Sequence, residues 1–319
     1  MVNGDHSVSL PSRGAILALN ATLRPLGTLL PANRLGVAAA RLGLAASCQI
    51  WMDEKLPHHL VDERGPRGRT AGEWVGEPPR PGTPLIYYLH GSGYVGCSPA
   101  THRGLVSELS RRLERPAFTL RYRLAPEYRF PAAHVDALNG YRWLLEQGHA
   151  AEDIVVMGDS AGGHMALGLC GQLRALKLPQ PRGVVAFSPL VDATWSLAAA
   201  RGEQVWDAFM SLGLATKMTG LYTGTKHFDD PRLNVLGGVG PDLPPMLLQA
   251  GGSEMLSADA EHYGRAQRAA GGRCEVQISP GMFHVFQVGH RFLPEAKSAL
   301  TCVERFVDDI AHGSAMRSA

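Results

Sequence analysis

From residue 84 onward, short unbroken runs of apolar residues alternate with longer stretches in which apolar residues recur every three or four positions. The runs are typical of buried strands, and the longer stretches are typical of helices with one apolar face. This alternation predicts an α/β fold, in which a mostly parallel sheet is covered by helices on both faces. The predicted strands are residues 84–90, 117–121, 154–158, 184–187, 246–250 and 275–278. The predicted helices are residues 101–113, 132–147, 161–176, 257–270 and 295–312.

Two regions interrupt this alternation. Residues 62–83 are rich in Gly, Pro and Arg, which predicts a loop-rich segment with a short strand at 73–75. Residues 192–240 are rich in large apolar and aromatic side chains, and we interpret them as a helical insertion over the end of the sheet. These side chains include Trp195, Trp206, Phe209, Met210, Met218 and Tyr222.

The N-terminal segment has a composition of its own. Residues 6–52 contain no Asp or Glu, but they contain four arginines among many leucines. Pro25 and Pro31 predict several short helices here rather than one long helix. Basic amphipathic helices can lie on a membrane surface, and they can also cover an apolar groove of the protein itself. The second interpretation is favoured, and peripheral membrane contact stays open as the alternative.

Composition narrows the class of protein. The chain has 319 residues, of which 45% are hydrophobic and 19% charged, so it can bury an ordinary apolar core. The net charge of +2 gives no general field for nucleic acid. Five cysteines without CxxC spacing predict neither a disulfide framework nor a zinc site, and reduced thiols favour a cytoplasmic location. The sequence contains no uncharged run of 18 apolar residues, so it predicts no membrane span.

The strongest chemical motif lies between a predicted strand and a predicted helix. Gly158-Asp-Ser-Ala-Gly162 fits the pattern G-x-S-x-G. In that context the motif is typical of a sharp turn that exposes a serine nucleophile above the sheet, and it identifies Ser160. The N-terminus of the following helix favours negative charge at the same place.

A second glycine-rich motif allows two interpretations. Gly91-Ser-Gly-Tyr-Val-Gly96 follows a strand and matches the dinucleotide fingerprint G-x-G-x-x-G. That fingerprint requires an acidic residue at the end of the next strand. Here the next strand ends in Arg121-Tyr122, so the dinucleotide interpretation is rejected.

A serine nucleophile requires a general base and an acid that orients it. His284 lies in a loop after the last predicted strand and is the first choice as base, with His290 as the second. Glu254 follows the strand at 246–250 and is the preferred acid. Asp259 lies one helical turn later and remains the alternative. The chain order of serine, acid and histidine is that of α/β-hydrolases.

Four segments together resemble the hormone-sensitive-lipase-type (class IV) carboxylesterases of the α/β-hydrolase superfamily. They are His90-Gly-Ser-Gly-Tyr-Val95, Tyr122-Arg-Leu-Ala-Pro-Glu-Tyr-Arg-Phe-Pro-Ala-Ala133, Gly158-Asp-Ser-Ala-Gly-Gly163 and Gly281-Met-Phe-His284. The resemblance implies an oxyanion hole built from the backbone N–H groups of Ser92, Gly93 and Ala161. It also implies a cap made of residues 1–60 and the insertion at about 192–240, on a catalytic domain of residues 61–319. Three departures from the family are Ser92, where it has a second glycine, Glu254-Met-Leu256, where it usually has Asp-Pro-Leu, and Asn234, where it tends to have Ser.

The function implied by this resemblance is hydrolysis of short- to medium-chain acyl esters through an acyl-enzyme, without a metal or an organic cofactor. Large side chains that could form the substrate pocket are Trp51, Trp206, Phe209, Met210 and Tyr222. Two alternatives remain: a catalytically inactive hydrolase fold that binds a ligand, and a hydrolase of lipid esters at a membrane surface. A homodimer is compatible with the sequence.

Overall fold

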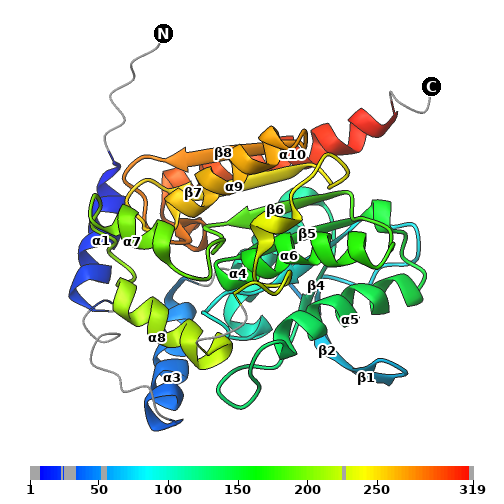
Figure 1. Ribbon diagram of the computed structural model, residues 1–319, viewed down its shortest axis with the longest axis horizontal. Coiled ribbons are helices and arrows are strands. Elements are labelled where there is room, and N and C mark those ends of the chain that lie inside the picture. Colours follow the sequence, from blue (N-terminus) through cyan, green and yellow to red (C-terminus); the bar gives the residue numbers. More distant parts are fainter. Residues whose placement is uncertain (1–7, 23, 25–33, 52–55, 225–227, 316–319) are drawn as a thin grey trace.

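The computed structural model describes residues 8–22, 24, 34–51, 56–224 and 228–315. Its centre is an eight-stranded sheet with the strand order β1-β2-β4-β3-β5-β6-β7-β8 (Figure 1). The strands are β1 (His58–Gly65), β2 (Gly68–Val75), β3 (Leu85–Leu89), β4 (Ala117–Leu120), β5 (Ile154–Asp159), β6 (Gly183–Phe187), β7 (Met246–Gly251) and β8 (Cys274–Ser279). All pairings from β4 to β8 are parallel, whereas β1 and β2 pair antiparallel.

Helices cover both faces of the sheet, and the central strands show why. In β3, Tyr87 and its alternate neighbours face one layer of helices, while Ile86 and Tyr88 face the other. Because both sides of the strand are buried, its sequence is continuously apolar rather than alternating. The covering helices are α4 (Pro99–Leu113) and α10 (Pro294–Ala315) on one face, and α5 (Ala132–Glu146), α6 (Ala161–Ala175) and α9 (Ser257–Ala269) on the other.

The six strands and five helices predicted from the apolar pattern are confirmed within a few residues at each end. The prediction of a loop-rich segment at 62–83 was wrong in part, because β1 and β2 form a hairpin there. Most side chains of β1 are exposed, so the strand lacks the apolar residues that would have predicted it. The proposed boundary near residue 60 therefore falls inside β1.

Four helices lie together beside the sheet and form a cap (Figure 1). They are α1 (Leu10–Ala21) and α3 (Arg34–Trp51) from the N-terminal segment, and α7 (Ser196–Gly202) and α8 (Leu212–Thr223) from the insertion. Pro25 and Pro31 lie between α1 and α3, outside the described residues. The N-terminal segment is thus helical on both sides of the prolines, as predicted.

Polar contacts hold the N-terminal helices against the rest of the structure. At the start of α1, the backbone N–H of Ser9 donates to the Glu295 carboxylate over 2.8 Å, and the Ser12 hydroxyl donates to it over 2.7 Å. In α3, Arg41 forms an ion pair with Glu127 at 2.8 Å. Leu19 of α1 is buried. These contacts support the interpretation that the segment covers a groove of the protein itself.

Candidate active site

The turn after β5 places Ser160 at the start of α6. Ser160 has a φ of 52° and a ψ of −118°, which is an unusual backbone conformation for a residue with a side chain. Its backbone N–H donates to the carbonyl of Phe187 over 2.8 Å, so the neighbouring strand helps to hold the turn. A Cβ on Gly158 would lie 2.6 Å from the carbonyl oxygen of Gly162. The close approach of the two arms of the turn therefore requires glycine at position 158.

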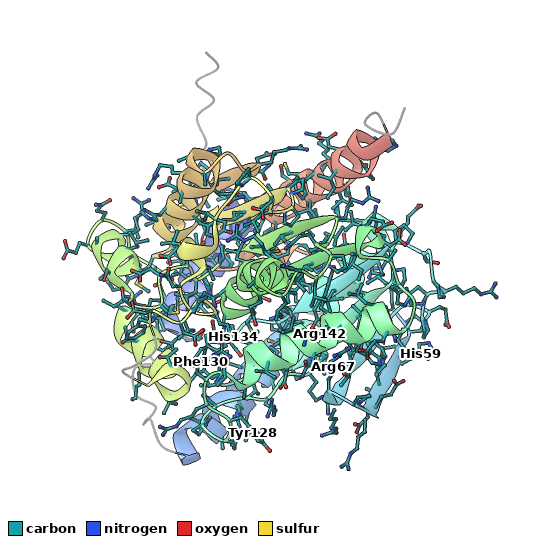
Figure 2. All side chains as sticks on the ribbon, turned by 45° about the vertical axis from the view of Figure 1, so that its right-hand side comes forward. His59, Arg67, Tyr128, Phe130, His134 and Arg142 are labelled. Carbon is teal, nitrogen blue, oxygen red and sulfur yellow. The ribbon has the colours of Figure 1, made fainter. Side chains whose placement is uncertain are left out.

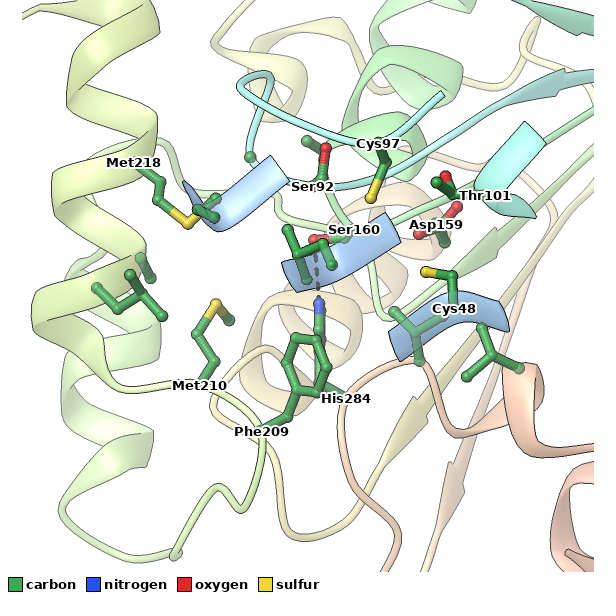
Figure 3. A pocket seen from close by; sticks show the side chains of 18 of the residues that line it. Cys48, Ser92, Cys97, Thr101, Asp159, Ser160, Phe209, Met210, Met218 and His284 are labelled. Carbon is green, nitrogen blue, oxygen red and sulfur yellow. Dashed lines mark hydrogen bonds between the residues drawn. The ribbon is translucent and has the colours of Figure 1, made fainter. Parts of the chain in front are cut away.

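Two side chains from later loops, His284 and Glu254, complete a hydrogen-bonded chain with this serine. Figure 3 shows the bond between Ser160 and His284. Nε2 of His284 lies 3.0 Å from Oγ of Ser160, and Nδ1 of His284 lies 2.6 Å from Oε2 of Glu254. The second carboxylate oxygen of Glu254 accepts the N–H of Gly251 over 2.8 Å. His284 and Glu254 are buried, with side-chain exposures of 4% and 0%. A hydroxyl, an imidazole and a carboxylate thus lie in the order that acyl transfer requires of a nucleophile, a base and an acid.

The charged groups around His284 favour its protonated form. Burial alone would lower the pKa of His284, but the adjacent carboxylate of Glu254 raises it above the usual value. Asp207, a residue of the insertion, also acts to raise it. Asp159 acts in the same direction, so the imidazolium that would form during proton transfer from Ser160 is stabilised by three carboxyl groups.

Asp207 was not identified from the sequence. Its carboxylate is buried and accepts the backbone N–H groups of Phe209 at 2.9 Å, Met210 at 3.0 Å and Met255 at 3.2 Å. It therefore joins the cap to the loop that carries Glu254. Burial raises the pKa of Asp207. No motif in the sequence marks Asp207, because its bonds to Phe209 and Met210 form a local turn and only its bond to Met255 joins residues 48 apart.

The structure places the alternative residues elsewhere. Oδ1 of Asp259 accepts the N–H groups of Val191 and Asp192, both at 2.8 Å, and so holds the entry to the insertion. Burial raises the pKa of Asp259 to about 7. Among the described residues, no hydrogen bond joins the Asp259 carboxylate to His284, whereas the Glu254 carboxylate bonds to Nδ1 of His284. His290 is buried and does not line the cavity that contains Ser160.

The predicted oxyanion residues surround the serine. Ser92, Gly93 and Ala161 line the same cavity as Ser160. Ser92 has a φ of 104°, and its hydroxyl accepts the N–H of Gly96 over 3.2 Å while donating to the carbonyl of the same residue. The Ser92 side chain therefore bonds within its own loop, which explains how the loop contains a serine in place of a second glycine.

A cavity of about 300 Å³ opens over Ser160 and His284. Its walls are mainly apolar and come from both the cap and the catalytic domain. Two of the five predicted wall residues, Phe209 and Met210, line it (Figure 3). The ring of Phe209 lies 5.6 Å from the imidazole of His284. Wall residues that sequence reasoning did not identify include Leu19, Leu44, Cys48, Cys97 and Val288.

The assignment of Trp206 to the pocket wall was wrong. Its side chain is 65% exposed, and it does not line the cavity. The Trp206 indole donates to Oδ1 of Asn20 over 2.7 Å, and the guanidinium of Arg24 lies 3.8 Å from the ring centroid. Trp206 therefore joins the insertion to the N-terminal segment on the outside of the cap.

The assignment of Tyr222 was also wrong. Tyr222, a residue of α8, is buried, and its ring stacks on Tyr94 at a centroid distance of 4.3 Å. Its hydroxyl lies 2.8 Å from Nδ1 of His134, and its ring meets that of Phe130 edge-on (Figure 2 labels His134 and Phe130). This is core packing between the cap and the catalytic domain. The fifth predicted wall residue, Trp51, ends α3, and its side chain lies outside the described part of the structure.

Two further observations concern metal ligands and membrane-spanning helices. Across residues 8–22, 24, 34–51, 56–224 and 228–315, no three His, Cys, Asp or Glu side chains are placed to share a metal ion. None of the helices formed by these residues is both long enough and apolar enough to cross a membrane.

Comparisons with known proteins agree with this fold. Residues 86–288 match the family model described as α/β hydrolase fold. The chain is 30% identical to the carboxylesterase/phospholipase LipF of Mycobacterium tuberculosis over 97% of this chain and 84% of LipF. It is 30% identical to an esterase/lipase from an uncultured bacterium whose crystal structure superposes with a TM-score of 0.82, over 95% of this chain and 99% of the other. An esterase of the bacterial hormone-sensitive lipase family superposes with a TM-score of 0.82 at 29% identity, over 94% and 98% of the two chains.

The chain therefore belongs to the α/β-hydrolase fold family, and within it to the carboxylic ester hydrolases related to hormone-sensitive lipase.

Proposed function

We propose that the protein hydrolyses short- to medium-chain acyl esters with Ser160 as nucleophile, His284 as general base and Glu254 as the acid partner. The observation that carries this proposal is the bonded chain of 3.0 Å from Ser160 to His284 and 2.6 Å from His284 to Glu254, at the floor of an apolar cavity. The name of LipF as a carboxylesterase supports it. A ligand-binding fold without catalysis would not require this arrangement.

In the first half of the reaction, Oγ of Ser160 attacks the ester carbonyl carbon while Nε2 of His284 takes the hydroxyl proton. The carboxylate of Glu254 stabilises the imidazolium through Nδ1. The tetrahedral intermediate collapses, and His284 gives its proton to the leaving alcohol. In the second half, water attacks the acyl-enzyme with the same base, which releases the carboxylic acid and restores Ser160.

The negative charge of each tetrahedral intermediate requires fixed donors. We assign this role to the backbone N–H groups of Ser92, Gly93 and Ala161, since all three residues line the cavity around Ser160. Gly91, next to them, donates its own N–H to Asp159 over 3.0 Å. The loop is thus held by a bond to the residue that precedes the nucleophile, which keeps the donors in place before substrate arrives.

The size of the cavity supports small acyl groups. Its volume of about 300 Å³ is at the lower end of the range of ligand pockets. We expect hydrolysis of p-nitrophenyl esters to be fastest between acetate and octanoate and to decline toward palmitate. The measurement is kcat/KM across that series, with diisopropyl fluorophosphate labelling and mass spectrometry to identify the labelled serine. A folded protein that hydrolyses none of these esters, or that is labelled at a serine other than Ser160, would overturn the proposal.

The pH dependence of kcat/KM is expected to have an acid limb set by His284. The imidazole accepts a proton only when it is neutral, so activity appears as the pH rises through its pKa. Because Glu254 raises that pKa above 6.5, we expect the midpoint of the limb above pH 6.5. A profile measured from pH 5 to 9 with an uncharged ester tests this. A midpoint below that of ordinary histidine would contradict the arrangement.

Lipid esters at a membrane surface are the second candidate substrate class. The observation that favours them is the exposure of Leu10, Leu17 and Leu42 on the N-terminal helices, at 80%, 70% and 73%. Exposed apolar side chains on basic helices can insert into a lipid interface. The ester series is presented on anionic vesicles, and the vesicles are then sedimented. Sedimentation separates the two candidates, because only a protein that binds the lipid surface sediments with the vesicles.

A further inference from the structure

A second group of reactive side chains lines the cavity beside the proposed nucleophile. Cys48 comes from α3 of the cap, Cys97 follows the glycine-rich loop, and His102 lies in the first turn of α4. All three line the cavity together with Asp159, and Figure 3 shows the Cys48 and Cys97 thiols near the Asp159 carboxylate. The proposed esterase mechanism uses neither of the two thiols nor His102.

His102 and Asp159 form a buried ion pair. Nε2 of His102 lies 3.3 Å from Oδ2 of Asp159, and the two side chains are 8% and 5% exposed. Burial alone would lower the pKa of His102, but the Asp159 carboxylate raises it to about 9. Asp159 also accepts the Tyr88 hydroxyl over 2.8 Å, which helps it to stay ionised. A positive charge is therefore present in this part of the cavity at neutral pH.

This environment acts on the thiol of Cys97. A hydrogen bond with the Cys48 thiol lowers the pKa of Cys97, burial raises it, and the positive charge of His102 and a hydrogen bond with Thr101 lower it again. Asp159 acts in the opposite direction, and the net effect is a lowered pKa. The thiolate is the reactive form of cysteine, and a cation beside it is the usual means of producing one.

We propose that Cys97 and Cys48 form a peroxide-reactive thiol pair in the substrate cavity, with Cys97 as the attacking thiolate and Cys48 as the resolving thiol. In the first step, the sulfur of Cys97 attacks one oxygen of hydrogen peroxide. The O–O bond breaks, Cys97 becomes a sulfenic acid, and the leaving hydroxide takes a proton and becomes water. In the second step, the sulfur of Cys48 attacks that of Cys97, the S–O bond breaks, and the hydroxide leaves with the Cys48 proton as a second water. The two thiols lose two electrons, and the peroxide gains them.

The packing of the two segments that carry the thiols makes the second step feasible. A Cβ on Gly96, the residue before Cys97, would lie 3.6 Å from the side chain of Leu44, which is one helical turn before Cys48 on α3. Both thiols line the same cavity, and a disulfide requires Cα atoms about 4.4–6.8 Å apart. The bond would join α3 of the cap to the segment that follows Gly96. Gly96 bonds to Ser92 in the proposed oxyanion loop, so oxidation is expected to slow ester hydrolysis. That consequence rests on the proposed function, whereas formation of the disulfide does not.

The other cysteines in the sequence provide an internal comparison. Cys170 and Cys274 are buried, and burial raises the pKa of each thiol to about 12. Cys302 is partly exposed on α10, away from the cavity lining. Reactivity with peroxide is therefore expected at Cys97 ahead of these three.

The test is treatment of the full chain with a small excess of hydrogen peroxide, followed by alkylation and mass spectrometry of non-reduced peptides. We expect the loss of two thiols per chain, a linked peptide containing Cys48 and Cys97, and reversal by dithiothreitol. The same result is expected in the Ser160→Ala variant, so failure of the esterase proposal would leave this one intact. Absence of the linked peptide, or equally rapid oxidation of Cys302, would overturn the proposal.

Variants assign the two roles. Cys48→Ser is expected to stop at the sulfenic acid, which dimedone traps on Cys97, whereas Cys97→Ser is expected to prevent the reaction. Cys302→Ser is the matched control and should behave as the unaltered protein. In His102→Gln, the pH at which half of Cys97 reacts should rise by about one unit, because the positive charge is removed. An unchanged pH profile would show that His102 does not activate the thiol and would overturn that part of the proposal.

Discussion

Replacement of Ser160 by alanine is expected to lower kcat for p-nitrophenyl ester hydrolysis by roughly 10⁶-fold, to the level that binding and the oxyanion donors support without a nucleophile. The substitution removes the oxygen that His284 contacts at 3.0 Å and leaves the backbone turn in place. Its N–H still donates to Phe187, so the fold should be unchanged. Far-ultraviolet circular dichroism and thermal unfolding serve to verify this.

The matched control for this experiment is Ser196→Ala. Ser196 is an exposed serine at the start of α7 that does not line the cavity. Its replacement should leave kcat/KM within a factor of about two, as is usual for surface substitutions. If Ser160→Ala kept more than a few per cent of the activity while folded, another nucleophile would have to carry the reaction.

Replacement of Glu254 by glutamine is expected to reduce kcat by about 10⁴-fold, because an amide can no longer stabilise the imidazolium or hold Nδ1 protonated. Glu254 is fully buried, lies 2.6 Å from Nδ1 of His284 and accepts the N–H of Gly251, so its position is well defined. Since Glu254 raises the pKa of His284, the acid limb of the residual activity should move to lower pH. Steady-state kinetics from pH 5 to 9 measure both effects.

Asp259→Asn is the control that separates the two acids. Its side-chain oxygen can still accept the N–H groups of Val191 and Asp192, so the entry to the insertion should be kept. Burial already raises the pKa of Asp259 to about 7, which makes a neutral group easy to accommodate. We expect kcat/KM to stay within about tenfold of the unaltered protein, as for a group that supports the fold and not the reaction. A larger loss in Asp259→Asn than in Glu254→Gln would reverse the assignment.

The parallel core and the serine turn could be predicted because their signals are local. Strands buried on both faces have continuous apolar sequences, and Gly158-Asp-Ser-Ala-Gly162 lies between one of them and a helix. The hairpin of β1 and β2 could not be predicted in the same way. Its first strand has mostly exposed side chains, so its pairing depends on backbone bonds that leave no apolar pattern.

The residues that line the cavity could also be predicted only in part from local sequence. Phe209 and Trp206 are neighbouring aromatic residues of one insertion, and nothing in their sequence distinguishes them. The first faces His284, whereas the second is exposed and bonded to Asn20. Which of them lines the pocket depends on how the N-terminal helices pack against the insertion, and that packing joins segments almost 200 residues apart.

By itself, the amino-acid sequence determined the layered α/β fold, the position of Ser160 and the order in which an acid and a histidine follow it, because strand burial, turn chemistry and chain order are properties of short segments. The tertiary structure decided that Glu254 rather than Asp259 bonds to His284, that Asp207 joins the insertion to the loop that carries Glu254, and that Cys48 and Cys97 line one cavity. These relations are distances between loops distant in the chain, and only folding brings such loops to the same edge of the sheet.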